Sequence, residues 1–514
     1  MVAGGELLTI QIGEYANFIG THFWNLQNHT LFQESAGKVD SALDWNVLLR
    51  EENFNGKTER TYTPRVVAFE EKFNVNLNPL ISNLETSLDV DSILLNNFKI
   101  EKKEAQPLIR NEFLQDVVQN RFSRNGFYNL DDKVNYWTDF ILQPWHPKSL
   151  CLMSAFEQCS FEDCQRRAEG RQIFDEIETH VRFFAEEMDY IEGIQLLCDV
   201  SSNLAGMSST LLRYFKDDYG NIPVLAIPCW PAHLQTMNRL SVEKLVWDSS
   251  QSLLTMLSES LSTLPLSLST ELWGKDSQFC QWNELKYEPQ STYHTSAIIA
   301  AALETATIPW RCLNNDSSSS SISLKNTLDA LNNFGQNSIV RLGLSMPFKW
   351  PSVDNRQDFS KDMLGLTNLS PCYPGCSLAD AQSQSTCIEN LAGCLKEIPN
   401  RIFATSHPLY TGAPFPNLFN STVDKHGNVG CSTSSSEGSS SCSSEARQIG
   451  EAVFSSPSLS YLASNTCEGI VSMLQKQLCK LPTHRYDKLA VEELHENLFK
   501  FSIRKGDDYC SDSD

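Results

Sequence analysis

The sequence predicts an α/β fold in which a mostly parallel sheet is covered by helices on both faces. Three largely apolar runs support this prediction, because Glu6–Ile12, Ile194–Val200 and Val224–Ile227 each have the pattern of a buried strand. Between the first two runs, apolar residues recur three and four positions apart from Ile177 to Met188, which predicts one face of a helix. Alternating strands and helices favour parallel strands joined by right-handed crossovers.

Chain length and charge exclude several classes of protein. A chain of 514 residues is too long for one core, since single cores stop growing near ~250 to 300 residues, so we expect two or three packed units. The net charge of −22, from 41 basic and 63 acidic residues, opposes binding to nucleic acid and favours neutral or basic protein partners.

Cysteine content and apolar run length indicate where the chain resides. Sixteen cysteines in 514 residues are too sparse for a disulfide scaffold, and the start of the sequence lacks the pattern of a secretory signal, so we expect a reducing cytosol. The apolar runs are shorter than the roughly 20 residues needed to span a bilayer, so we expect any membrane association to be peripheral.

Beyond the first strand and helix the pattern is less regular. Residues 31–60 are polar and read as an insertion before a second strand at Thr63–Phe69. Ala297–Thr307 has the composition of a buried helix whose small residues permit close packing. Two serine tracts, Ser317–Ser321 and Ser432–Ser444, lack apolar side chains and predict flexible loops.

The end of the chain reads as helical. Apolar residues recur at helical spacing from Cys467 to Leu478, and the last residues, Asp507–Asp514, form an acidic string.

Four cysteines in the second half could suggest a metal site: Cys372, Cys376, Cys387 and Cys394. Their separations by three, ten and six residues match no common paired-ligand pattern for zinc. We therefore favour reduced thiols on a loop and predict no metal site.

Several segments, in the same order along the chain, resemble tubulin. The stretch Leu8–Gly20 is similar to the first strand and nucleotide loop of tubulin, with matches at Gly13, Asn17 and Gly20. The other similar segments are Thr63–Val67, Ile191–Leu212, Leu240–Val246 and Ser464–Thr466. The resemblance implies a tubulin/FtsZ-like fold with a parallel-sheet N-terminal domain, a central helix, an α+β middle domain and a helical C-terminal tail.

Within that superfamily, the run Tyr15–Phe18 and the following Thr21–Asn25 resemble the Misato family. That resemblance implies roles in mitochondrial distribution, morphology and fusion. It also implies a location in the cytoplasm and, peripherally, on the cytosolic face of the mitochondrial outer membrane. In some members it implies roles in spindle assembly.

From the resemblance we predict these domain boundaries: a tubulin-like N-terminal domain at 1–241 with an insertion at 31–60, a central helix at 242–264, a middle domain at 265–430, a serine-rich linker at 431–449, and a helical C-terminal region at 450–514.

The resemblance also places a vestigial nucleotide site at Gly13, Asn17, Ser202, Asn203 and Gly206. Tubulin wraps the phosphates with a glycine-rich loop, because glycine adopts positive φ and lets backbone N–H groups approach the oxygens. No glycine of that loop matches a glycine in Ser201–Met207, and a left-handed leucine or alanine would cost about 1 to 2 kcal/mol. Either the hydroxyl and amide side chains replace the lost backbone donors, or the loop is packed for structure, which we favour.

Three further positions weaken nucleotide binding in this alignment. Glu14 replaces a glutamine that lies near the phosphates in tubulin. Its carboxylate would either repel the phosphates or point into solvent without effect. Lys72 falls where tubulin has a glutamate that helps to hold magnesium, and a lysine cannot ligate Mg²⁺. It is either a direct phosphate ligand or, as we favour, a surface lysine. Leu257 falls at the position of the asparagine that reads the base.

The resemblance implies a regulator of mitochondria, and the changed nucleotide loops lead us to expect a non-catalytic scaffold with no catalytic residues and no cofactor. The alternatives are a slow GTPase that binds GTP and self-assembles, and a cofactor of tubulin folding or spindle assembly that binds tubulin or its chaperonin.

Overall fold

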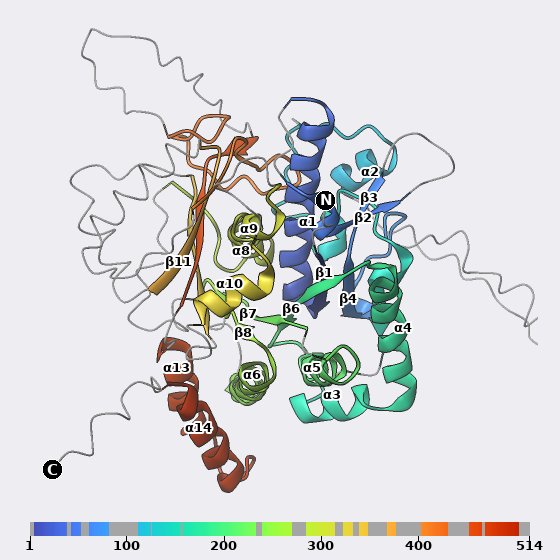
Figure 1. Ribbon diagram of the computed structural model, residues 1–514. Coiled ribbons are helices and arrows are strands. Elements are labelled where there is room, and N and C mark those ends of the chain that lie inside the picture. The colour runs from blue at the N-terminus through green and yellow to red at the C-terminus, as the bar shows by residue number, and fades with distance from the viewer. Residues whose placement is uncertain are drawn as a thin grey trace, which may run out of the picture.

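The computed structural model describes these residues: 5–38, 43–52, 61–81, 111–124, 126–154, 156, 158–220, 222–232, 239–269, 284–313, 322–332, 339–347, 367–376, 402–429, 452–464 and 468–502 (Figure 1). The predicted serine tracts Ser317–Ser321 and Ser432–Ser444 and the acidic string Asp507–Asp514 lie outside them.

A parallel sheet forms the centre of the first half of the chain. Its strands run in the order β5 (Leu150–Met153), β4 (Val66–Glu71), β1 (Glu6–Ile12), β6 (Ile191–Asp199), β7 (Val224–Trp230) and β8 (Ser262–Thr263), and β9 (Leu266–Ser267) also pairs with β7. Every described pairing within it is parallel. The three predicted strands are therefore confirmed, and they lie side by side.

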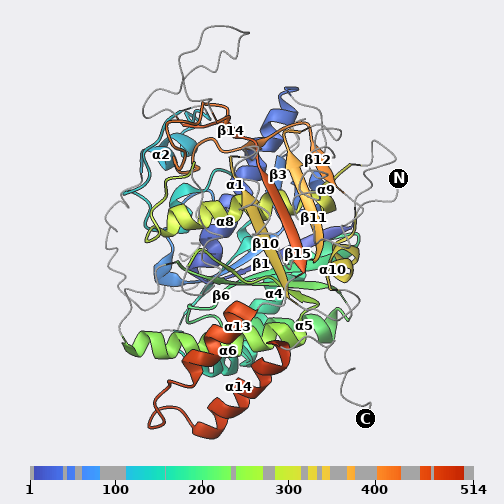
Figure 2. The ribbon, with the colours of Figure 1, turned by 90° about the vertical axis from the view of Figure 1, so that its left-hand side faces the viewer.

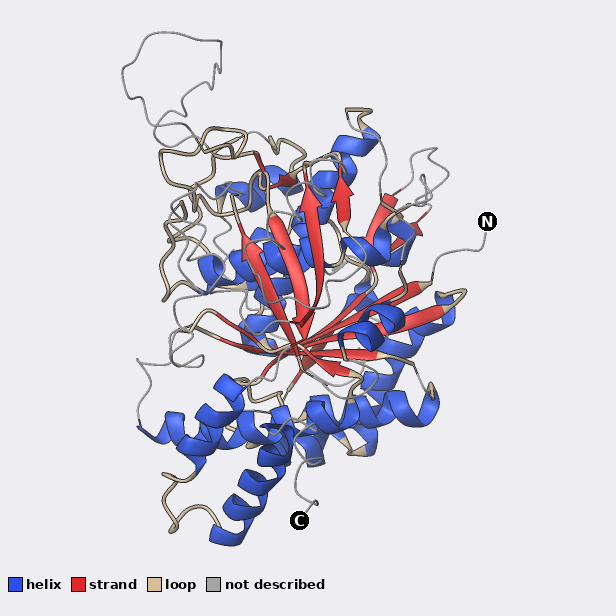
Figure 3. Ribbon diagram, turned by 60° about the vertical axis from the view of Figure 1, so that its left-hand side comes forward, coloured by secondary structure: helices blue, strands red, loops and turns tan. Residues whose placement is uncertain are grey.

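Helices cover both faces of this sheet, because alternate residues of each strand point to opposite sides. On one face Leu7 of β1 packs in the same core as Phe18 and Ile19 of α1 (Glu14–Ser35). On the other face Leu8 and Ile10 pack in a second core, which includes residues of α3 (Phe161–Ala168), α4 (Arg171–Glu187) and α5 (Met207–Asp218). Figure 3 shows these layers as blue helices around the fan of red strands.

A second, mixed sheet belongs to the latter half of the chain. Its order is β10 (Val340–Ser345), β15 (Leu459–Ser464), β11 (Thr367–Pro374) and β12 (Phe403–Thr405). The first two pairings are antiparallel and the third is parallel. Figure 2 shows this sheet standing beside α8 (Thr292–Ala306) and α10 (Leu324–Leu331).

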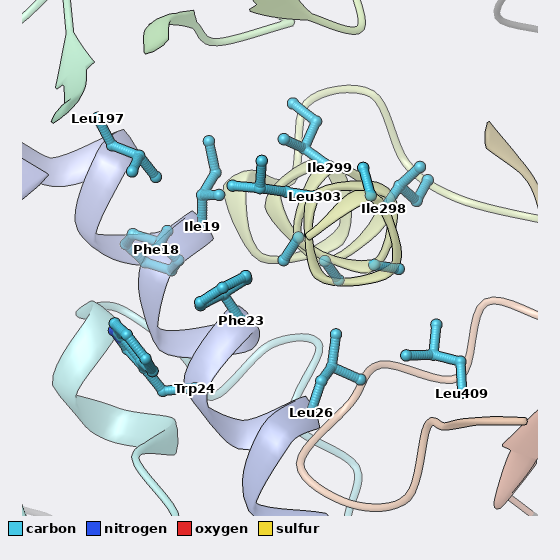
Figure 4. Close-up of a cluster of buried hydrophobic side chains, with 14 of the residues drawn as sticks. Phe18, Ile19, Phe23, Trp24, Leu26, Leu197, Ile298, Ile299, Leu303 and Leu409 are labelled. Atoms are coloured by element: carbon cyan, nitrogen blue, oxygen red, sulfur yellow. The ribbon is translucent and has the colours of Figure 1, made fainter. Parts of the chain in front are cut away.

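The central helix is α8, and the predicted position at 242–264 is wrong. Helix α8 is buried along nearly its whole length and contacts α1 on one side and β10, β11 and β15 on the other, so it lies between the two units. In Figure 4 the side chain of Leu303 on α8 approaches Ile19 of α1. The predicted buried helix at Ala297–Thr307 is thereby confirmed, although it begins earlier than expected.

Residues 242–264 instead contribute most of α6 (Arg239–Glu259) and the short strand β8. The helix ends where serine side chains bond backbone carbonyls, since Ser258 Oγ donates to Thr255 O, and Pro265 follows soon after. Helix α6 packs on α5 and on the tail helices α13 (Glu468–Leu478) and α14 (Lys488–Ser502). The boundaries of the other predicted units stay predictions.

The predicted insertion at 31–60 is only partly irregular. Helix α1 continues to Ser35, and β2 (Leu49–Glu52) pairs antiparallel with β3 (Thr61–Pro64), so the predicted strand Thr63–Phe69 divides into β3 and β4. Arg65 separates them, because its N–H donates to Leu48 O and its carbonyl accepts from Thr9 N.

The remaining short elements connect these layers. They are η1 (Trp45–Val47), η2 (Lys72–Asn74), α2 (Glu112–Val118), η3 (Trp137–Phe140), η4 (Pro147–Ser149), α9 (Ile308–Arg311), β13 (Leu409–Tyr410) and β14 (Ser455–Ser456). Over the part of the chain that the structure describes, no helix is both long enough and apolar enough to cross a bilayer.

Candidate functional site: the strand ends around Gly13

The carboxyl ends of β1, β4 and β6 meet beside the start of α1, which is where ligands bind in many open α/β sheets. Gly13 makes the turn from β1 into α1 with φ of 84°. A Cβ on this residue would lie 2.6 Å from the Cβ of Ser202, so the turn accepts only glycine here. The Gly13 N–H also donates to Phe69 O at 3.0 Å, which fixes the turn to β4.

The first turn of α1 is capped by a carboxylate of the protein itself. Asp199 is the last residue of β6, and its Oδ2 accepts a hydrogen bond from the backbone N–H of Tyr15 at 3.0 Å. Its Oδ1 accepts from the N–H of Ser201 at 2.9 Å and from the Ser201 hydroxyl. A helix N-terminus attracts anions through its free N–H groups and its dipole. At α1 this role is filled by Asp199.

The turn Ser201–Gly206, which follows β6, uses its backbone donors internally. The Ala205 N–H donates to Ser202 O at 3.1 Å, and the Leu204 N–H donates to Ser202 Oγ at 3.1 Å. The Ser202 N–H donates to Asp199 O at the end of β6 at 3.1 Å. Donors that are bonded in this way are not free to surround a phosphate.

The same turn is anchored by its apolar side chains. Leu204 and Ala205 are buried in the core beneath α3 and α5. Within the described backbone, positive φ does not occur between Ser201 and Met207. The backbone of this turn therefore follows a different path from that of a glycine-rich phosphate loop and needs no left-handed residue. This agrees with the favoured interpretation of a packed segment.

A buried carboxylate at the end of β4 lies on the other side of the first helical turn. Glu70 is fully buried, and its Oε2 accepts from Asn17 Nδ2 at 2.9 Å while its Oε1 accepts from the Glu71 N–H at 3.0 Å. Asn203 Nδ2 approaches Glu71 Oε2 at 3.4 Å. These contacts connect β4 to α1 and to the turn after β6.

The resulting site is strongly acidic. Burial, followed by the nearby charges of Asp199 and Glu71, raises the pKa of Glu14 to about 7. Burial raises the pKa of Glu70 to about 8 despite the hydrogen bond from Asn17. The pKa of Asp199 is also raised by burial, although its hydrogen bonds to Ser201 and Tyr15 oppose the shift. These shifts indicate an environment that disfavours any added negative charge.

The structure brings together four of the five predicted site residues, namely Gly13, Asn17, Ser202 and Asn203. Gly206 ends the same turn and begins α5, where a Cβ would collide with the Phe161 carbonyl of α3. This contact explains the glycine by close packing of two helices, and its part in a nucleotide site stays a prediction.

Two other positions named from the alignment also lie away from the site. Lys72 is exposed in η2, as the surface interpretation predicts. Leu257 is buried in the apolar cluster that joins α6 to α13 and α14, so it does not occupy a base-reading position. The alignment failed there because α6 packs outside the parallel sheet, whereas α8 is the central helix.

Asp199 is the main functional residue that the sequence analysis missed. A signal was present, since an aspartate near the end of an apolar run and two residues before a serine pair is typical of a side chain that bonds nearby backbone N–H groups. Its contact with Tyr15, however, joins residues 184 positions apart, and no local pattern predicts it.

Among the described residues, no group of three or more histidine, cysteine, aspartate or glutamate side chains is arranged to hold a metal ion. Cys372 is buried and Cys376 is partly buried, while Cys387 and Cys394 lie outside the described residues. Nor do the residues at the end of β4 fit the magnesium site of a GTPase, because the side chains of Glu70 and Glu71 are engaged by Asn17 and Asn203.

Comparisons with known proteins give one consistent result. A family model described as the Misato Segment II tubulin-like domain matches residues 5–119, and a tubulin domain model matches residues 129–312. Protein misato homolog 1 of Bos taurus is 24% identical, and the alignment covers 94% of each chain. Protein misato of Drosophila melanogaster is 25% identical over 72% of this chain and 71% of its own length. Protein DML1 of Gibberella zeae is 27% identical over 69% of each chain.

The two models adjoin each other along the first 312 residues and coincide with the parallel sheet, α1 and α8. The relatives extend the similarity into the second sheet and the tail helices. The chain therefore resembles the Misato family along nearly its whole length and has a tubulin/FtsZ-like fold.

Proposed function

We propose that this Misato-like protein is a non-catalytic regulator of mitochondrial distribution, morphology and fusion, and that it acts as a scaffold. The observation that supports a non-catalytic role is the Asp199 carboxylate at the N-terminus of α1. The resemblance to the Misato family supports the mitochondrial part of the proposal, through the roles that it implies.

The site is poorly suited to a nucleotide. A phosphate at the start of α1 would have to displace Asp199 from the Tyr15 N–H, and it would then face Glu14 and Glu71. A pair of like charges about 4 Å apart costs about 4 kcal/mol at an effective dielectric near 20. The turn Ser201–Gly206 offers little compensation, because the N–H groups of Ser201, Ser202, Leu204 and Ala205 already donate to Asp199 or within the turn. We therefore expect neither GTP nor another cofactor to reside here.

Without chemistry at this site, the protein would act through its surfaces. The net charge of −22 favours neutral or basic protein partners over nucleic acid. In this proposal the partners include tubulin or its folding chaperonin, and the protein associates peripherally with the cytosolic face of the mitochondrial outer membrane.

The proposal is tested by depletion and rescue in cells. Depletion should alter the mitochondrial network, and re-expression of the wild-type chain should restore it. An Asn203→Trp variant should restore it equally well, because Asn203 is half-buried at the mouth of the site and a large side chain there would obstruct any nucleotide. A matched Lys325→Trp variant, on exposed α10 surface, controls for the added tryptophan.

The experiment tests the mitochondrial role and the non-catalytic role separately. A normal mitochondrial network after depletion would contradict the mitochondrial role. Failure of Asn203→Trp at normal abundance, with Lys325→Trp still active, would contradict the non-catalytic role.

A further inference from the structure

Acidic side chains join the elements around Gly13 to one another. Asp199 of β6 accepts from the start of α1, Glu70 of β4 accepts from Asn17 of α1, and Asn203 of the turn approaches Glu71. The turn Ser201–Gly206 and the first turn of α1 are therefore both attached to strand ends through carboxylates.

The surroundings of these carboxylates provide little positive charge. Over the described residues, Glu14, Glu70 and Asp199 form no ion pair with lysine, arginine or histidine. Lys72 follows Glu71 but is exposed. Two further cations lie near Cys159: Arg167 of α3, which is exposed, and Lys244, which is paired with Asp248 at 2.7 Å. The titratable groups that face the carboxylates from the packed elements are Tyr15 on α1, Cys198 on β6, Cys229 on β7 and Cys159 before α3.

Glu14 lies near enough to Asp199, Glu71 and Glu70 for their negative charges to repel, so the closed arrangement is more stable when some of these carboxyls are neutral. Like charges at short range repel by a few kcal/mol when they are shielded from water. Each proton held by the cluster removes one such repulsion and also supplies a donor for a neighbouring oxygen. Asn17 Oδ1, which is buried beside Glu70 and has no bonded donor among the described residues, could accept from a protonated Glu70.

We propose that Glu14, Glu70, Glu71 and Asp199 form a proton-dependent lock, which holds the turn Ser201–Gly206 and the start of α1 closed while it is protonated and releases them when it ionises. The lock is a property of this chain's own residues, and it operates whether or not the mitochondrial proposal is correct.

The pKa values of Glu70 and Glu14 determine whether the lock opens as pH rises or as pH falls. In the closed state the pKa of Glu70 is about 8 and that of Glu14 is about 7, whereas a solvated glutamate has the ordinary value of about 4.5. Between about pH 4.5 and pH 8 the closed state therefore holds protons that the open state has lost. One such group raises the opening equilibrium constant by up to about tenfold per pH unit. From pH 6 to pH 8 we expect local opening to increase on the order of 10- to 100-fold.

Hydrogen–deuterium exchange at peptide resolution measures this opening. Exchange of peptides covering residues 13–20 and 200–208 is followed from pH 6 to pH 8 and divided by that of a peptide from α8, because base catalysis accelerates all amides alike. In the wild-type chain this ratio should rise by at least tenfold. In Glu70→Gln, which keeps an acceptor for the Glu71 N–H but cannot ionise, the rise should be much smaller.

A matched control is Glu192→Gln, at the opposite end of β6. Burial also raises the pKa of Glu192, but its carboxylate accepts a hydrogen bond from the N–H of Leu324 and, among the described residues, makes no contact with the four residues of the lock. This variant should keep the wild-type ratio. A wild-type ratio that does not change with pH would overturn the proposal, and so would an equal rise in Glu70→Gln. The wild-type series is decisive by itself if either variant fails to fold.

Discussion

Replacing Leu204 by alanine should destabilise the protein substantially, because this leucine anchors the turn that replaces a phosphate loop. Its side chain is fully buried among residues of α3, α5 and the parallel sheet. Truncation of a buried leucine to alanine typically costs about 2 to 5 kcal/mol, from lost burial and from the cavity that remains. The neighbouring Gly206 is in tight contact with the Phe161 carbonyl, so the backbone has little room to collapse into the cavity. We therefore expect a loss of about 3 kcal/mol.

Urea unfolding followed by tryptophan fluorescence measures this loss as a lower midpoint, with an unchanged slope indicating that the surface exposed on unfolding is the same. The matched control is Leu489→Ala on α14, whose side chain is 73% exposed and which should change stability by less than about 0.5 kcal/mol. If Leu204→Ala were as neutral as Leu489→Ala, the turn would not be an anchored structural segment, and the reasoning would be refuted.

Two further predictions concern acidity and location. Because a neutral Glu70 is favoured in the folded protein, its contribution to the free energy of unfolding should be fully present below about pH 4.5 and should be lost as pH rises through about 8. The loss should reach up to about 1.4 kcal/mol per pH unit. In urea melts Glu70→Gln should reduce this pH dependence, and an unchanged pH dependence would show that Glu70 does not cause it. In fractionated cells, the mitochondrial pool of the protein should be extracted by alkaline carbonate and digested by protease added to intact organelles. Recovery in the carbonate-resistant pellet would contradict peripheral association.

Much of the parallel sheet could be predicted from the sequence, for a physical reason. Strands covered on both faces are rich in apolar residues, so β6 and β7 appear as largely apolar runs that can be identified without knowing their partners. The central helix could not be assigned in the same way. Both α6 and α8 carry apolar residues, and only their packing partners distinguish an outer helix from one between two sheets.

The site shows the same division. Gly13 and Asn17 were predicted because a local motif contains them, and the structure places them together at the start of α1. Asp199 was missed because its importance comes from the Tyr15 N–H, far away along the chain. The sequence also could not decide whether the turn after β6 binds phosphate or is packed for structure. Serine and asparagine side chains suit both a phosphate site and a closed turn. Burial of Leu204 decides between them.

Titration of the purified protein with GTP, with and without Mg²⁺, tests the central claim that this tubulin-like site has lost its nucleotide. If the phosphate, metal and base contacts each lose about 1.4 kcal/mol, affinity falls roughly a thousandfold when the losses add, which takes a nanomolar site to the micromolar range. We predict no tight binding by calorimetry and no hydrolysis at high protein concentration. Submicromolar, magnesium-dependent affinity would contradict the account, because GTP would then have displaced Asp199 from the start of α1.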